Sequence, residues 1–136
     1  MALTEGMKRW NQRVEEEMKK GSDSDYLENY PKIVQDLYEE LKEQVLKLFP
    51  STQIMKKKNY LSFKSKTNFL DVQLQQKALK CIINVKKGVL KDSNKLTRDI
   101  SEKGHFGAGD YEFLINSMND IERVMDLIVQ SHKTNS

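Results

Sequence analysis

The spacing of apolar residues changes at Gln53, and this change limits the fold more than any other feature. Before it, residues 31–49 carry one broad apolar face at intervals of three and four, which predicts a helix that Pro50 ends. After it, apolar and polar residues alternate in three runs, at residues 59–66, 68–75 and 78–85. Because short turns join these runs, the sequence predicts an antiparallel meander.

Further elements extend this meander on both sides. Short strands are predicted at residues 53–57 and 111–115, and Asn94 is a candidate N-cap of a short helix that reaches residue 103. Ser117 and Asp120 resemble a helix-start pair, followed by apolar residues at core spacing. We therefore expect an α+β fold, in which an antiparallel sheet of about four to five strands packs against helices.

The first residues form a separate amphipathic segment. Apolar residues follow one another at intervals of three and four up to Gly21, and residues 21–25 are typical of a linker. The expected organisation is an N-terminal helical arm at 1–24, a single domain at 25–132 and a disordered tail at 133–136. The arm packs on the domain, on a partner or on a second copy of the chain. Its apolar stripe is Leu3, Met7, Trp10, Val14 and Met18.

Composition excludes several classes of protein. No apolar run approaches the roughly 18 residues that span a bilayer, so we expect no membrane partner. A single cysteine, Cys81, excludes an internal disulfide and a thiolate zinc cluster, which favours a reducing, cytoplasmic setting. The net charge of +3 is distributed unevenly, because residues 51–100 contain 12 basic and 3 acidic residues. These lysines either keep exposed strands soluble or form a surface that faces a polyanion.

Three of the six glycines lie in the stretch GHFGAG, at Gly104, Gly107 and Gly109. The stretch is neither a P-loop nor a dinucleotide fingerprint, because it lacks the Lys-Ser/Thr pair and precedes a strand. The simplest interpretation is a structural turn from a helix to a strand, with positive φ at the glycines and Gly104 as the helix C-cap. Asp99 and Asp110 flank this turn.

The turn accounts less well for His105. A histidine near carboxylates can support acid–base chemistry, but the sequence offers no obvious nucleophile, since Cys81 falls in the apolar register of its strand. No second histidine stands at metal-ligand spacing, because His132 lies close to the C-terminus. We therefore favour a non-catalytic domain without a metal or cofactor.

Basic residues interleaved with aromatic ones indicate a nucleic-acid interface. In the stretch KKKNYLSFKSK, Tyr60 alternates away from the apolar face and is a stacking candidate. The expected contact residues are Lys58, Tyr60, Lys64, Lys80 and Arg98, with His105 and Phe106 on the glycine turn.

Four segments, in order, resemble a bacterial domain family of unknown function that has carried the label "predicted transport protein". The similarity covers about residues 25–131, and its most specific part is the pattern R-D-(I/V)-S-x-x-G-H-(W/F)-G-x-G-D, which runs here from Arg98 to Asp110. Phe106 stands where tryptophan is frequent. The resemblance implies a domain at the C-terminal end of nuclease- or restriction-associated proteins, and hence a role in defence. Nothing in the sequence supports transport.

The leading hypothesis is therefore an accessory domain that binds nucleic acid, DNA in preference to RNA, beside a nuclease domain or partner protein. One alternative is an interaction module that dimerises through the N-terminal helix. Another is a small nuclease or hydrolase centred on His105.

Overall fold

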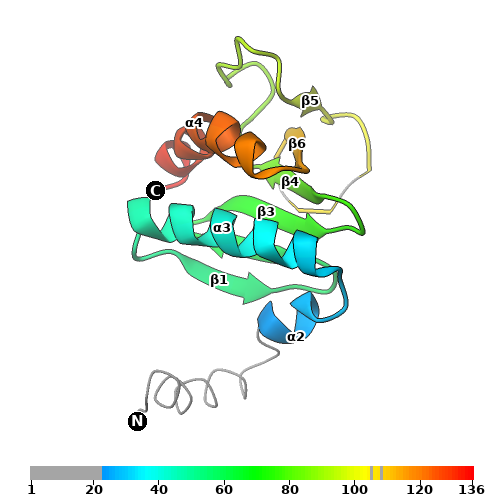
Figure 1. Ribbon diagram of the computed structural model, residues 1–136. Helices are drawn as coiled ribbons and strands as arrows, with labels where there is room; N and C mark the ends of the chain where they lie inside the picture. Colours follow the sequence, from blue (N-terminus) through cyan, green and yellow to red (C-terminus); the bar gives the residue numbers. More distant parts are fainter. Residues whose placement is uncertain (1–22, 105, 108) are drawn as a thin grey trace.

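The structure is a computed structural model, and it describes residues 23–104, 106–107 and 109–136. Six strands form one antiparallel sheet in these residues, in the order β1-β2-β3-β4-β6-β5, and α3 and α4 lie side by side on one face of it (Figure 1). The elements are α2 (Asp23–Leu27), α3 (Lys32–Leu48), β1 (Gln53–Lys56), β2 (Leu61–Lys64), β3 (Asn68–Leu74), β4 (Leu79–Ile83), β5 (Arg98–Asp99), β6 (Tyr111–Ile115) and α4 (Met118–Thr134).

The α+β class is confirmed, with one or two strands more than we expected. The hydrophobic core lies between the helices and one face of the sheet. Cross-strand pairing places Val72 of β3 beside Leu61 of β2 and Cys81 of β4, and all three are fully buried. Burial of each large aliphatic side chain contributes about 1.5–3 kcal/mol. The helices supply the other half of the core through Val34, Leu37, Tyr38, Leu41, Val45, Ile121, Val124, Leu127 and Ile128.

Helix boundaries follow local signals. Pro31 precedes α3 as its N-cap residue in an extended conformation, and Phe49 is its C-cap, directly before Pro50. At the start of α4, the side chain of Ser117 makes no capping hydrogen bond. Instead, Asp120 accepts a hydrogen bond at 3.0 Å from the backbone N–H of Asn116, the residue before the N-cap, so this contact differs from the reciprocal pair that the sequence predicts.

Two expectations from the sequence are wrong. Residues 94–103 do not form a helix, because Arg98 and Asp99 pair with β6 as the edge strand β5. Residues 21–25 are not all linker, because α2 begins at Asp23 and is fixed by tertiary contacts. The hydroxyl of Tyr26 in this helix donates to the carbonyl of Asn59 and accepts from the N–H of Leu74. The N-terminal arm, with its proposed dimer contact, lies outside the described residues.

The chain does not become irregular after residue 132 as expected, because α4 continues to Thr134. The amide of Asn135 then donates to the carbonyls of Asn84 and Ser131. The buried hydroxyl of Ser131 in turn donates to the carbonyl of Phe69 at 2.6 Å. Hydrogen bonds to the ends of β3 and β4 therefore order the last residues.

An irregularity in β3 explains the position of Phe69, which the alternating pattern assigns to the polar face. The pairing partners change from Phe63–Leu70 to Lys64–Asn68, which leaves Phe69 as an extra residue in a bulge. Its ring packs against His132 at a centroid distance of 4.9 Å, and His132 also stacks on Phe49 at 3.6 Å. Burial among these rings lowers the pKa of His132 below its ordinary value of 6.5.

Acidification should therefore destabilise the fold through His132. In the unfolded chain, His132 takes up a proton near pH 6.5, whereas in the folded protein burial keeps its ring neutral to a lower pH. The contribution of His132 to the free energy of unfolding is therefore complete above pH 6.5. It is lost as the pH falls toward the depressed pKa of the folded state. We expect the urea midpoint to fall between about pH 7.5 and about pH 5.5, and to fall less in His132→Phe. Equal pH dependence of the two proteins would contradict this assignment.

Candidate functional site

The face of the sheet away from the helices carries a row of polar residues. Pairing between strands aligns Ser62, Asp71, Ile82, Glu112 and Arg98 across β2, β3, β4, β6 and β5. No described helix packs on this side (Figure 1), yet the first four residues of the row are buried. Segments other than these helices must therefore cover them.

The glycine stretch between β5 and β6 covers part of this row. Gly107 lies directly on Asp71, because a Cβ built at Gly107 would stand 2.6 Å from its carboxylate oxygen Oδ2. Beside it, the rings of Tyr60 and Phe106 approach to a centroid distance of 4.9 Å. Ile100 is buried at the start of the loop, and its N–H donates to the carbonyl of Asp110 at 2.8 Å. The stretch thus folds back over the sheet.

Two of the three glycines have the backbone conformation that we expected. Gly107 has φ +72° and Gly109 has φ +115°, both in the region that side chains rarely adopt. The expectation is wrong for Gly104, which has no positive φ and faces open space. It cannot cap a helix, because the preceding residues form β5 and a turn.

The aspartates that flank the glycine stretch hold neighbouring backbone. The carboxylate of Asp110 accepts a hydrogen bond from the N–H of Lys87 at 2.7 Å. The carboxylate of Asp99 accepts from the N–H of Ser101 at 2.9 Å, and this bond lowers the pKa of Asp99. Asp99 also lies 3.9 Å from the ammonium group of Lys87. These contacts tie the loop after β4 to both ends of the glycine stretch.

The carboxylate of Asp71 influences two neighbours. Burial, followed by the negative charge of Asp71, raises the pKa of Tyr60, although a backbone hydrogen bond from Gly107 opposes the shift. Burial and Asp71 also raise the pKa of Cys81, which keeps its buried thiol protonated and unreactive. This is the core position that the apolar register of β4 predicts.

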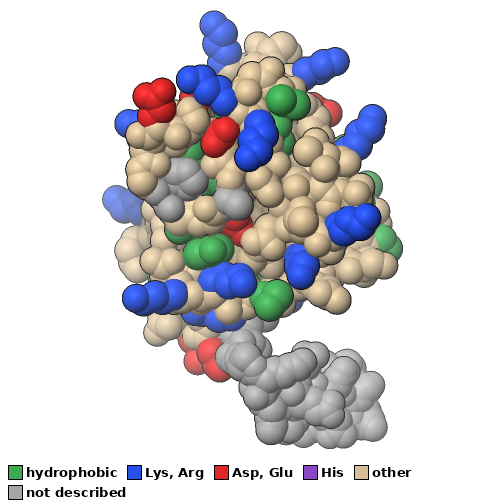
Figure 2. Space-filling view, turned by 180° about the vertical axis from the view of Figure 1, so that it is seen from behind, with side chains coloured by type: hydrophobic (Ala, Val, Ile, Leu, Met, Phe, Trp, Pro, Cys, Tyr) green, Lys and Arg blue, Asp and Glu red, His purple; other side chains and the backbone are tan. Residues whose placement is uncertain are grey.

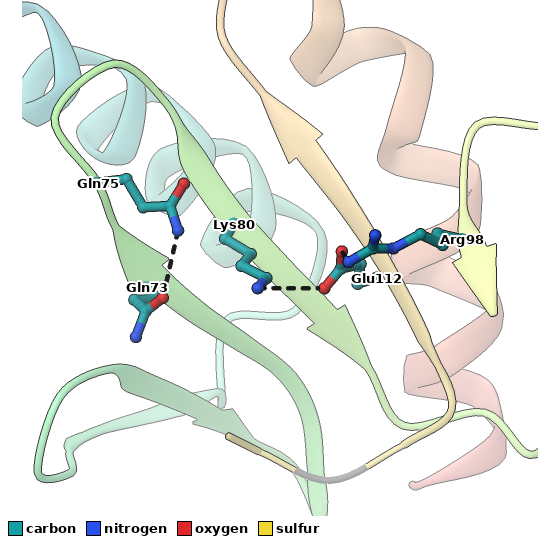
Figure 3. A network of polar contacts seen from close by, with 5 residues as sticks. All are labelled: Gln73, Gln75, Lys80, Arg98 and Glu112. Carbon is teal, nitrogen blue, oxygen red and sulfur yellow. Dashed lines mark hydrogen bonds and ion pairs between the residues drawn. The ribbon is translucent and has the colours of Figure 1, made fainter. Parts of the chain in front are cut away.

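Three charged residues meet on the helix-free side of the sheet. Glu112 of β6 accepts a hydrogen bond from Arg98 of β5 at 2.5 Å and lies 3.5 Å from the ammonium group of Lys80 in β4. Figure 3 shows these side chains on one side of the sheet, with Gln73 and Gln75 nearby. A depression of about 500 Å³ adjoins them, lined by Gln75, Lys80, Leu96, Thr97, Arg98, Glu112, Phe113 and Leu114.

The fold brings together some of the expected contact residues. Lys80 and Arg98 meet at Glu112, and Tyr60 meets Phe106. Lys58 is exposed in the turn before β2, whereas Lys64 lies at the other end of β2, opposite Asn68. His105 is outside the described residues, and so is any nuclease site centred on it.

Sequence reasoning did not identify Glu112 or Asp71 as site residues. Both alternate with apolar residues in their strands, so the sequence could predict that they lie on the polar face of the sheet. The pairing of Glu112 with two cations could not be predicted, because it depends on β6 lying between β4 and β5.

Residues 23–104, 106–107 and 109–136 contain neither a candidate metal site nor a candidate membrane span. No three His, Cys, Asp or Glu side chains there are grouped so that they could hold a metal ion. Every helix in these residues is too short or too polar to cross a membrane.

Comparison with known proteins assigns the family. The family model described as "Domain of unknown function (DUF5655)" matches residues 23–135, and the chain belongs to this family. An uncharacterized protein of Haemophilus influenzae is 40% identical over 117 residues, which cover 86% of this chain and 39% of the relative. The chain thus spans about two fifths of the length of that bacterial relative. No solved structure matches it.

The three glycines should respond differently to alanine. Gly109→Ala places a Cβ 2.1 Å from the carbonyl oxygen of Ile83 at a positive φ, so we expect a loss of more than about 2 kcal/mol of unfolding free energy. Gly107→Ala should also destabilise, because Asp71 must move. Gly104→Ala is the matched control, expected to be neutral or to stabilise by up to about 1 kcal/mol. Equal effects in urea unfolding would contradict the assigned geometry.

Proposed function

We propose that this member of the DUF5655 family is a non-catalytic nucleic-acid-binding domain that uses the helix-free side of its sheet. The distribution of charge between the two layers supports this. Residues 51–100, which form β1 to β5 and their turns, carry 12 basic and 3 acidic residues. Helix α3 carries three basic and four acidic residues, and α4 carries two and three. The segment that contains β1 to β5 is therefore positive, whereas each helix has a net charge of −1.

The two acidic residues of the row, Asp71 and Glu112, present little surface to a bound polyanion. Asp71 is 1% exposed beneath Gly107, and the side chain of Glu112 is 8% exposed between two cations. Figure 2 shows many separate Lys and Arg side chains around this side of the molecule. A charged surface of this kind attracts phosphate without reading sequence.

The aromatic pair offers a second type of contact. Tyr60 and Phe106 are half-buried and lie side by side, and Tyr60 is two residues from Lys58 in the sequence. Bases of a single strand stack on such rings, and each stacked base contributes about 1–3 kcal/mol. We therefore propose a single-stranded or locally opened nucleic acid as the ligand, with DNA as the first choice.

The context of the domain extends the proposal. The chain matches 39% of its Haemophilus relative, so the domain can occur as part of a longer protein. We propose that it holds DNA for a nuclease domain in the same chain or in a partner protein, in a restriction or defence system. Such a role belongs in the bacterial cytoplasm, where the DNA is.

A salt titration tests DNA binding. A fluorescent single strand with hydroxyl groups at both ends should bind, and its affinity should fall steeply as salt rises. Lys58→Gln and Lys64→Gln should each lower the slope of log affinity against log salt by about 0.7. Lys32→Gln removes one positive charge from the exposed surface of α3 and is the matched control, expected to leave the slope unchanged.

Two outcomes of the same assay would contradict the proposal. If single-stranded DNA, duplex DNA and RNA all fail to bind at low salt, the proposed function is wrong. If Lys32→Gln changes the slope as much as the sheet variants do, binding does not use the helix-free side.

A further inference from the structure

We propose that the depression beside Lys80, Glu112 and Arg98 is a subsite for a phosphomonoester carried by a nucleoside. The ligand is either a mononucleotide or the phosphorylated end of a strand, which share this chemistry. The inference rests on the proposed function for its ligand class, and it names one small site within the larger surface.

The geometry of the carboxylate supports a preformed cation pair. Glu112 directs one oxygen to each partner, with Oε2 at 2.5 Å from Nη2 of Arg98 and Oε1 at 3.5 Å from Nζ of Lys80. The side chain of Glu112 is 8% exposed, whereas those of Lys80 and Arg98 are 27% and 59% exposed. The carboxylate therefore sits below two cations that still reach solvent.

The charge balance of the three residues favours an additional anion. One cation would compensate a buried carboxylate, but two leave a net charge of +1 at the edge of the depression. A guanidinium has five N–H donors, and the hydrogen bond to Glu112 uses one nitrogen of Arg98. Arginine binds phosphate through two parallel hydrogen bonds and lysine acts as a point charge, so the pair is suited to a phosphoryl group.

A monoester fits this site better than a diester of an intact strand does. At neutral pH, a phosphomonoester carries about −1.5 to −2 charge, whereas a diester carries a single negative charge. Two convergent cations stabilise the more highly charged group more strongly, because Coulomb energy scales with the product of the charges.

The walls of the depression suit a nucleoside. Its volume of about 500 Å³ lies within the range of small-ligand sites. Leu96 and Leu114 supply apolar surface for a planar base, and Leu114 is exposed although it lies in a strand. Gln75 lies at the rim near Gln73, with its Nε2 3.4 Å from the oxygen Oε1 of that residue (Figure 3). Carboxamides can donate to and accept from the edge of a base.

Nuclear magnetic resonance of ¹⁵N-labelled full chain tests the subsite. Adenosine 5′-monophosphate should shift amide signals of residues 96–98 and 112–114, which line the depression. Adenosine and inorganic phosphate should each cause weaker shifts, because each offers only half of the contacts. If the nucleotide shifts none of these signals at millimolar concentration, and a terminal phosphate adds nothing to strand binding, the inference is overturned.

Two variants separate a phosphate site from a structural ion pair. Arg98→Gln leaves Lys80 to compensate Glu112, and should weaken nucleotide binding about tenfold or more. Arg98→Gln combined with Glu112→Gln leaves the net charge at +3, so weaker binding there cannot come from overall charge. Lys32→Gln should bind as the wild type does, and the ¹⁵N spectrum shows that each variant is folded. Unchanged affinity in both Arg98 variants overturns the inference.

Strands with different ends distinguish the two sources of the phosphate. If a strand with a 5′- or 3′-phosphate binds more tightly than its hydroxyl form, the ligand is a strand end. If only the free nucleotide binds at the depression, the ligand is a mononucleotide. Equal binding of all strands and no nucleotide binding would overturn the subsite while leaving the proposed function intact. Nucleotide binding at the depression without any strand binding would support the subsite and overturn the proposed function.

Discussion

The close contact between Gly107 and the buried carboxylate of Asp71 determines much of what the helix-free side can present. A side chain at position 107 would meet that carboxylate at 2.6 Å, so only glycine lets the backbone approach so near. This contact holds the loop against the sheet, which places Phe106 on Tyr60. It also sets the path of the chain into β6, whose Glu112 pairs with Arg98.

The same arrangement separates charge within a small domain. Helices cover one face of the sheet and form the hydrophobic core with it. The other face buries Asp71 beneath a loop and Glu112 between two cations. Many Lys and Arg side chains remain in solvent around it, with fewer Asp and Glu side chains among them (Figure 2). The positive charge of this side therefore follows from the number of basic residues and from the two cations that offset the charge of Glu112.

The glycine stretch illustrates how far a sequence can be interpreted. Gly107 and Gly109 have the positive φ that a turn predicts, since backbone conformation is a local property of the residue. The surroundings of the turn were not predictable. A helix at residues 94–103 agrees with local propensity, but pairing of Arg98 and Asp99 with β6 overrides it. The bulge at Phe69 is similar, because alternation fixes the two faces of a strand only while the register is regular.

The sequence by itself determined the α+β class, the bounds of α3 to within a residue, most of the strands and the concentration of positive charge in residues 51–100. These features follow from periodicity and composition, which are local properties that can be read along the chain. The tertiary structure alone decided which residues meet: Lys80 and Arg98 at Glu112, Tyr60 at Phe106 and Gly107 at Asp71. Each of these pairs depends on strand order, register or the path of a loop, and these are set by packing between segments far apart in the chain.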